Sequence, residues 1–275
     1  MTLAQVASYD QQKRRAWAGH ADAYAYAQTF GLLCAHPIEQ LLDVARVSRG
    51  VLVLDAGTGA GAVAAAALGR GARVTAVDPD PDMRRLARRS APGAEVVDGA
   101  LPDLALPTGA FDAVVANFVL NQVGDPLASA TELARVARPG AWVAVSVWPR
   151  PVTELHRVWD DVVESARLEM VPALTLAPHL EFERSPDGLA DLLTRAALVS
   201  VEALTVRYVH CVDAEVWWSG PARGVASIGA IVKSQTPIVV ARLKAQYDRL
   251  SRRYLASDGL LHLPTAAVLA YAQAP

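Results

Sequence analysis

The chain has 275 residues, 52% of them hydrophobic and 20% charged, which is a globular composition with enough apolar side chains for a sizeable core. The net charge of −2, from 26 basic and 28 acidic side chains, offers no general attraction for nucleic acid or for an anionic membrane. Both partners are therefore disfavoured, and a small or neutral partner is expected. At this length a single overall domain with an elaboration is expected, as a monomer or a homodimer.

The cysteines and the N-terminus bear on the compartment. Cys34 and Cys211 lie far apart in the sequence and lack the paired spacing of metal ligands, so free thiols and no metal site are predicted. Residues Met1 to Lys13 contain no apolar core of a signal peptide, and no apolar run reaches the roughly 18 residues of a membrane span. These features predict a cytoplasmic protein.

The first 48 residues read as helical. The stretch from Gln11 to about Ala27 places aromatic side chains at helical intervals, and Pro37 opens a second helix over Ile38 to Val47. A helix packed on the core is one interpretation of the first stretch. The other is a flap, residues 1–48, that closes over a ligand.

A glycine-rich turn follows the first predicted strand. The apolar run Val51 to Leu54 predicts a buried strand, Asp55 ends it, and Gly57, Gly59 and Gly61 let the chain turn sharply into a helix from about Ala62. The N-terminus of that helix directs unpaired backbone N–H groups toward whatever lies above the strand. The pattern is typical of a nucleotide-binding turn.

Strands and helices alternate through residues 49–150. Further strands are predicted at four places: Arg73 to Asp78, Glu95 to Val97, Phe111 to Asn117, and Ala141 to Trp148. This alternation predicts a doubly wound, Rossmann-like α/β sheet with right-handed crossovers, in which ligands bind at the carboxyl ends of the strands. Polar side chains fall at those ends, namely Asp55, Asp78, Asp98 and Asn117. They are expected to lie along one edge of the sheet.

The pattern changes in residues 151–275. Helices are predicted over Leu155 to Met170 and Pro186 to Ala196, a strand over Val199 to Val209, and a last strand near the C-terminus. Residues 213–257 form an insertion between these two strands. Because the insertion leaves and rejoins the same sheet, a helical lid over the site is predicted.

The glycine turn is consistent with two cofactors. Gly57, Gly59 and Ala62 satisfy the G-x-G-x-x-G/A pattern of dinucleotide folds, and Asp78 stands where such folds keep a ribose acid. An NAD(P)-dependent oxidoreductase is therefore one hypothesis. S-adenosylmethionine is the other, because Asp55 directly before the glycines suits a bound ammonium group and is awkward beside a pyrophosphate.

The run from Val51 to Trp148 closely resembles the class I S-adenosylmethionine-dependent methyltransferases. The matching motifs are Asp55 to Gly61, Ala76-Val77-Asp78, Phe111 to Asn117 and Arg138-Pro139-Gly140, in the family's order. The resemblance implies a seven-stranded sheet whose last strand is antiparallel, with S-adenosylmethionine as the cofactor. The core is thus expected to carry an N-terminal helical flap and a helical lid inserted before the last strand.

The resemblance also implies roles for single residues. Gly57 and Gly59, supported by Asp55, would hold the methionine portion of the cofactor, and Asp78 would accept both ribose hydroxyls. Met83 would pack on the adenine, while Asn117 and Phe118 would contact the methionine end. Many relatives carry an Asp that binds the adenine amino group where this chain has Ala100. Here either Asp98 or the backbone of Ala100 and Leu101 is expected to bind that amino group.

The acceptor is less constrained, because methyl transfer needs positioning and a dry site more than a particular side chain. His20 and His210 are candidate bases or acceptor contacts, and Tyr24 and Trp217 are candidate substrate contacts. Asn117 is followed by Phe118-Val119-Leu120 rather than by the Pro-Pro-aromatic run of enzymes that methylate nucleic acid, which favours a small-molecule or peptide acceptor. The apolar lid and the Ala- and Arg-rich composition resemble natural-product tailoring methyltransferases. A cofactor-binding protein that catalyses a non-methylating reaction, such as a cyclisation, remains an alternative.

Overall fold

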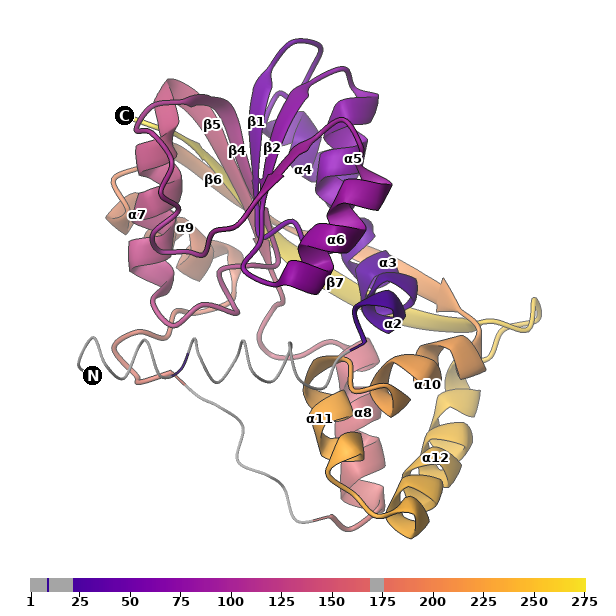
Figure 1. The fold of residues 1–275 in the computed structure, drawn as a ribbon. Coiled ribbons are helices and arrows are strands. Elements are labelled where there is room, and N and C mark those ends of the chain that lie inside the picture. Colours follow the sequence, from indigo (N-terminus) through magenta and orange to yellow (C-terminus); the bar gives the residue numbers. More distant parts are fainter. Residues whose placement is uncertain (1–8, 10–21, 169–175) are drawn as a thin grey trace.

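The structure, a computed structural model, describes Tyr9 and residues 22–168 and 176–275. A twisted sheet carries helices on both faces, and a separate group of helices lies off one end of the sheet (Figure 1). The seven strands run in the order β3-β2-β1-β4-β5-β7-β6. Their bounds are β1 Leu52–Ala56, β2 Arg73–Val77, β3 Glu95–Val97, β4 Phe111–Asn117, β5 Ala137–Val147, β6 Val199–Val212 and β7 Leu261–Gln273.

The described helices fall into three groups. Those before or between the first strands are α2 Ala23–Gln28, α3 Phe30–Ala35, α4 Ile38–Val44, α5 Ala62–Gly69 and α6 Pro81–Ser90. Those on the other side of the sheet are α7 Pro126–Val136 and α9 Pro186–Arg195. The separate group comprises α8 Glu154–Ser165, α10 Ala214–Ala222, α11 Ala226–Lys233 and α12 Pro237–Ser251, followed by the short η1 Arg252–Tyr254.

The strand directions confirm the expected fold class. The strands β1, β2, β3, β4 and β5 pair in parallel, whereas β7 pairs antiparallel with both β5 and β6. The central strands are buried on both faces: α7 and α9 contribute Leu133 and Leu192 to one apolar layer, and α4 and α5 contribute Leu41 and Val63 to the other. The unbroken apolar centre of β4 divides its side chains between these two layers, as is typical of a strand in the middle of a parallel sheet.

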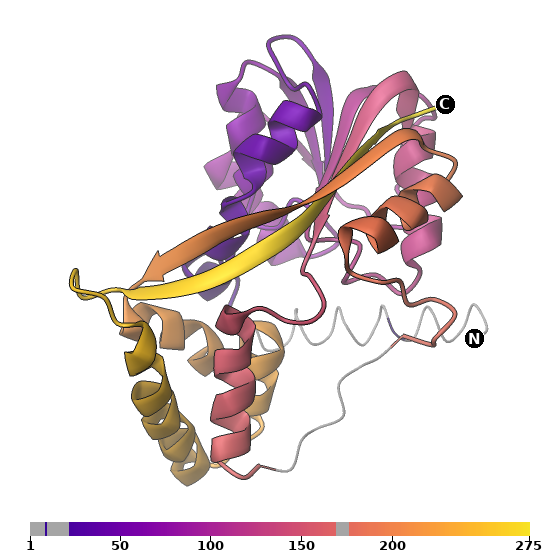
Figure 2. The same cartoon turned by 180° about the vertical axis from the view of Figure 1, so that it is seen from behind.

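Strands β6 and β7 form a long ribbon that leaves the sheet. The pairing of β5 with β7 ends at Val147↔Val268, but β6 and β7 remain paired as far as Val212↔Leu261. Figure 2 shows this ribbon running from the sheet to the helical group. Because α8 follows β5, and α10 to α12 connect β6 to β7, the helical group is attached at the carboxyl end of the parallel strands.

The helical group has an apolar core of its own. Leu155 and Trp159 of α8, Trp217 of α10 and Leu243 and Tyr247 of α12 are buried together. Trp159 stacks on Tyr247 with ring centroids 5.1 Å apart. The predicted insertion 213–257 therefore contains three helices that pack against α8 and against the ribbon.

Several predicted bounds were wrong by a few residues. The helix expected over Ile38 to Val47 ends at Val44, because Arg46 adopts a left-handed conformation with φ 54°. The helix expected from Leu155 to Met170 ends at Ser165, and Arg167 has φ 52°. Strand β5 begins at Ala137 rather than Ala141, since the strand continues through the Arg138-Pro139-Gly140 segment. Most of the helix expected from Gln11 lies outside the described residues.

Candidate functional site

The glycine turn is held by the backbone of the neighbouring strand. The N–H groups of Gly57 and Thr58 both donate to the Val77 carbonyl, at 2.8 and 2.9 Å. Gly57 has φ 76°, and a Cβ built on it would stand 2.5 Å from the Val119 side chain. Only glycine fits both the conformation and the space, so the turn brings main chain close to the loop after β4.

Asp55, at the end of β1, is a buried carboxylate that is only partly satisfied. Its Oδ2 accepts a hydrogen bond from the Thr58 hydroxyl at 2.6 Å, while Oδ1 is buried with no well-formed hydrogen bond from the described residues. Burial raises the pKa of Asp55 to about 7, against the lowering effects of the Thr58 hydroxyl and the Ala64 backbone. A carboxylate in this state is stabilised by any positive charge that comes within reach.

Asp78, at the end of β2, faces the same turn. Its Oδ2 accepts from the Gly59 N–H at 2.9 Å and its Oδ1 from the Asp80 N–H at 2.9 Å. Burial raises the pKa of Asp78 to about 6, although both backbone hydrogen bonds lower it. Each carboxylate oxygen accepts one bond here and can accept another, so two donors of a ligand could still be bound.

A second polar network closes the end of β4. The Asn117 Oδ1 accepts from the Ser146 hydroxyl at 2.6 Å, and the Asn117 Nδ2 donates to the Cys34 carbonyl at 2.9 Å. Phe118 follows with φ 57°, a rare conformation for a bulky residue, and its N–H donates to both the carbonyl and the hydroxyl of Ser146. Such strain persists only where the surroundings fix it, which is typical of functional positions.

The comparisons with known proteins bear on this arrangement. Residues 54–145 match a family model described as a methyltransferase domain. Residues 54–145 are therefore a methyltransferase domain, and the sheet has the class I methyltransferase fold. A search of curated proteins finds no significant match.

Several solved structures share the fold of this chain. A putative methyltransferase from Bacillus halodurans is 17% identical, with a TM-score of 0.54, over 86% of this chain and 98% of that chain. A putative methyltransferase from an antibiotic biosynthesis pathway of Anabaena variabilis is 19% identical, with a TM-score of 0.60, over 86% and 96%. The cyclase SpnF is 16% identical, with a TM-score of 0.52, over 87% and 81%. At these identities the likeness shows the fold alone.

S-adenosylmethionine is therefore the cofactor of this domain, and the candidate site fits it. The cofactor carries a positive sulfonium and an ammonium group, and the turn is flanked by two buried carboxylates, Asp55 and Asp78. A pyrophosphate would bring negative charge to the same two carboxylates, which is unfavourable in a buried site. The described residues contain no cluster of side chains that could hold a metal ion.

The residues expected at the adenine end differ in exposure. Met83 is buried, and its N–H donates to Asp80 at 3.1 Å. Asp98 keeps 74% of its side-chain surface exposed and forms an ion pair with Arg84 at 2.8 Å. The carbonyl of Ala100 accepts from the Asp103 N–H at 3.0 Å, and Leu101 packs against the sheet core.

The expected acceptor residues do not all meet. Tyr24 is 57% exposed on α2, whereas His210 and Trp217 are buried, with ring centroids 5.1 Å apart. His20 lies outside the described residues. Two of the four predicted residues thus come together, between β6 and α10.

Residues of α2, α3 and β6 near the site were missed as site residues by the sequence analysis. Tyr26 reaches within 3.8 Å of a Cβ built on Gly59, and its hydroxyl shares a hydrogen bond with the Cys34 thiol. Burial raises the pKa of Cys34 to about 12, so this thiol is neutral. His36 and Tyr208 stack with centroids 4.6 Å apart. The aromatic spacing of residues 17–28 was the only sequence signal, because α3 and β6 are far apart in the chain.

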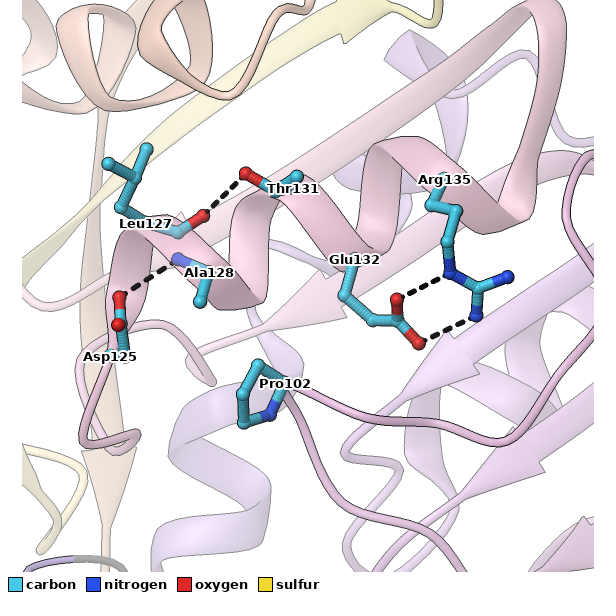
Figure 3. Close-up of a pocket in the computed structure, with 7 residues that line it drawn as sticks. All are labelled: Pro102, Asp125, Leu127, Ala128, Thr131, Glu132 and Arg135. Carbon is cyan, nitrogen blue, oxygen red and sulfur yellow. Dashed lines mark hydrogen bonds and ion pairs between the residues drawn. The ribbon is translucent and has the colours of Figure 1, made fainter. Parts of the chain in front are cut away.

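A surface hollow on α7 is separate from this site (Figure 3). It is lined by Pro102, Asp125, Leu127, Ala128, Thr131, Glu132 and Arg135. Its charged groups already have partners: Glu132 and Arg135 form an ion pair at 2.6 Å, and Glu132 also accepts from the Leu104 N–H. None of the predicted cofactor or acceptor residues lines the hollow, and its charges are used within the fold.

Among the described residues, no helix is both long and apolar enough to cross a membrane.

Proposed function

We propose that this protein transfers a methyl group from S-adenosylmethionine to a small-molecule or peptide acceptor in secondary metabolism. The observation that carries the proposal is the pair of buried carboxylates, Asp55 and Asp78, on either side of a glycine turn whose close approach tolerates no side chain at Gly57. The antibiotic-pathway context of the Anabaena variabilis relative supports the metabolic setting.

In this proposal the residues of the turn hold the cofactor. Asp78 accepts the two ribose hydroxyls while its bonds to Gly59 and Asp80 keep the carboxylate in place. Asp55 balances the positive methionine portion, and the backbone of Gly57 and Gly59 lies against it. When bound, S-adenosylmethionine supplies an electrophilic methyl group.

Other residues of the domain orient the two ends of the cofactor. Asn117 and Phe118 contact the methionine end, in an arrangement fixed by Ser146. Met83 packs on the adenine, whose amino group is taken by Asp98 or by the backbone of Ala100 and Leu101. Because Asp98 is paired with Arg84 and largely exposed, the backbone is the better candidate.

The acceptor is held between the domain and the helices that follow β5 and β6. We infer that residues 1–48 act as a flap and residues 213–257 as a lid, with the single domain divided into these parts and the core 49–150. His210 and Trp217 stay the candidate acceptor contacts, together with Tyr24 and His20. Excluding water there favours an in-line displacement, for which orientation supplies much of the acceleration.

The alternative is a reaction that uses the bound cofactor without transferring its methyl group, such as a cyclisation. The shared fold with the cyclase SpnF makes this the second candidate. Both candidates require S-adenosylmethionine, so cofactor binding does not separate them.

Calorimetric titration with S-adenosylmethionine, S-adenosylhomocysteine and NAD(H) tests the cofactor assignment. We expect the first two to bind and NAD(H) not to bind. Asp78→Asn should weaken S-adenosylmethionine binding about 10- to 100-fold, the effect of losing one charge-assisted hydrogen bond of about 1.5–3 kcal/mol. Asp191→Asn, an exposed carboxylate on α9, is the matched control and should change nothing.

Binding of NAD(H) alone would overturn the proposal. Transfer of labelled methyl groups to a panel of hydroxylated aromatic compounds then separates the two candidates. Product formation without methyl transfer would favour the cyclisation.

A further inference from the structure

Three buried polar atoms between β6 and α10 have no hydrogen-bond partner in the described part of the chain. They are the Tyr208 hydroxyl, the His210 Nε2 and the Trp217 Nε1. His210 is 3% exposed and Trp217 is 0% exposed. An unsatisfied buried polar group costs about 1–3 kcal/mol, and native proteins contain few of them. Three in one place therefore need an explanation.

The rings that carry these atoms touch one another. His36 stacks on Tyr208 at 4.6 Å and meets His210 edge-on at 5.4 Å, and His210 lies 5.1 Å from Trp217. Tyr208 and His210 are two residues apart on β6, so they point to the same face of the ribbon. These four residues, His36, Tyr208, His210 and Trp217, are called the ring cluster below.

The ring cluster reaches both the surface and the cofactor side of the molecule. His36 is exposed, and its Nε2 lies 3.1 Å from the Nδ1 of buried His210. Helix α3, which ends just before His36, is tied to the cofactor domain by the hydrogen bond from Asn117 to the Cys34 carbonyl. A ligand that enters beside His36 is thus next to the helix end that Asn117 holds.

All groups of the ring cluster are uncharged near neutral pH. Burial, and then His36, lower the pKa of His210 to about 4, and burial also lowers the pKa of His36. Burial raises the pKa of Tyr208. Cys34 on α3, which also acts on Tyr208, is a neutral thiol because burial raises its pKa. A charged ligand would lose its hydration here without gaining an opposite charge, which is costly.

The hydrogen-bonding capacity of the three atoms specifies the missing partner. Trp217 Nε1 can only donate, and the Tyr208 hydroxyl can donate or accept. His210 Nε2 donates or accepts according to which ring of the His36–His210 pair carries the shared proton. A neutral hydroxyl both donates and accepts, so it satisfies Trp217 and His210 in either tautomer. An ether cannot donate, and an ammonium group cannot accept.

We propose that the ring cluster is a binding subsite for a neutral hydroxyl group on an aromatic acceptor. The aromatic part has matching neighbours, since Phe30 stacks on Trp217 at 4.7 Å and Trp159 lies 6.0 Å from Trp217. This assignment rests on the proposed function and names its substrate class as phenols and related hydroxylated rings.

Phenol and its methyl ether, anisole, form a matched pair of probes. The protein is saturated with S-adenosylhomocysteine and titrated with each probe, while the Trp217 indole N–H is followed by NMR and assigned from Trp217→Phe. Phenol should shift that resonance saturably and bind about 5- to 10-fold more tightly than anisole, the effect of one neutral hydrogen bond. Equal binding of the two probes, or an unmoved Trp217 resonance, would overturn the proposal.

Two variants, Tyr208→Phe and Tyr247→Phe, distinguish an effect on phenol binding from an effect on the stability of the protein. Tyr208→Phe removes an unpartnered hydroxyl, so it should leave Tm unchanged or raised and weaken phenol binding about 5- to 10-fold. Tyr247→Phe is the control, because its hydroxyl donates to the Ala214 carbonyl at 2.7 Å. It should lower Tm and leave phenol binding unchanged.

The opposite pattern, a lower Tm with unchanged phenol affinity for Tyr208→Phe, would show that the hydroxyl has a structural role and would overturn the subsite. S-adenosylhomocysteine affinity, measured on the same samples, keeps the two proposals apart. A wild-type protein that binds S-adenosylhomocysteine but not phenol refutes the subsite, whereas a wild-type protein that fails to bind S-adenosylhomocysteine refutes the methyltransferase function.

Discussion

The glycine turn and the ring cluster differ in the charge and the origin of the side chains that they offer to a ligand. Around the turn, two buried carboxylates, Asp55 and Asp78, are held by backbone N–H groups and a hydroxyl, all within one βαβ unit. In the ring cluster, neutral aromatic side chains come from α3, β6 and α10, and three of their polar atoms have no partner among the described residues. The first region is organised for positive charge and the second for a neutral group.

The two regions differ in how readily their ligand preference can change. The turn depends on backbone conformation, which tolerates little change. The ring cluster depends on side chains brought together by tertiary packing, so its ligand can change by substitution without altering the sheet. Cofactor binding and acceptor binding should therefore respond separately to mutation.

Trp159→Ala should give the largest effect and tests that separation. Trp159 is buried between Trp217 and Tyr247 in the helical group, so its removal should lower the free energy of unfolding by about 3–5 kcal/mol. Affinity for S-adenosylhomocysteine, measured well below Tm, should stay close to that of the wild type. Ile238→Ala, at an 84% exposed position on α12, is the control for denaturant unfolding. A parallel loss of cofactor affinity would contradict the separation.

Gly61→Ala should disturb the turn instead. Gly61 has φ 90°, and a Cβ there would stand 2.8 Å from the Ala87 Cα. Backbone strain and overpacking together should cost about 2–4 kcal/mol, with loss of cofactor binding measured by calorimetry. Gly50→Ala is the matched control, since Gly50 has φ 84° but no described atom within 4 Å of its Cβ. If both variants cost the same, the close approach of α6 is unimportant.

Asp55→Asn should remove the pH dependence that Asp55 gives to the stability of the ligand-free protein. Because the pKa of Asp55 is raised to about 7 from 3.8, the folded state holds a proton that the unfolded state has released. The stability of the wild type relative to the variant should therefore fall as pH rises from about 4 to 7, by at most about 1.4 kcal/mol per pH unit. Urea unfolding of both proteins across this range measures it. A difference that is constant with pH would refute the raised pKa.

The same carboxylates make cofactor binding depend on pH in the opposite direction. Asp55 must be ionised to balance the positive methionine portion, Asp78 must be ionised to accept both ribose hydroxyls, and their pKa values are raised to about 7 and about 6. Affinity for S-adenosylmethionine should therefore rise by up to about 100-fold between about pH 5.5 and 7.5, with proton release on binding below about pH 7. Calorimetry in buffers of different ionisation enthalpy measures the released protons. Proton uptake would contradict the assignment.

Asp213→Ala should give the smallest effect, in the helical group. Asp213 caps α10 by accepting from the N–H groups of Glu215 and Val216 at 2.8 and 3.0 Å. Losing the cap should cost about 1 kcal/mol, whereas phenol and cofactor affinities should stay unchanged. A larger loss would show that α10 depends on its local cap more than on the packing of Trp217.

Some site residues could be predicted from the sequence and others could not. The positions of Asp55, Asp78 and Asn117 at strand ends followed from the alternation of apolar runs and turns, and the fold places them there. The same reasoning missed His36 and Tyr208, which are far apart in the chain, because no local pattern relates α3 to the far end of β6. It also missed that Asp98 would be paired with Arg84 on α6, because the two residues belong to different segments of the chain.

The methyltransferase domain could be predicted from the amino-acid sequence, because periodicity, glycines and acids at strand ends are local signals that specify a βαβ arrangement. The path of the β6–β7 ribbon away from the sheet could not, and this path brings together the aromatic rings of β6, of α10 and of the end of α3. The same packing leaves certain polar atoms of the described residues without a partner. Burial and hydrogen-bond satisfaction depend on distant segments packing together, and only the folded chain contains that information.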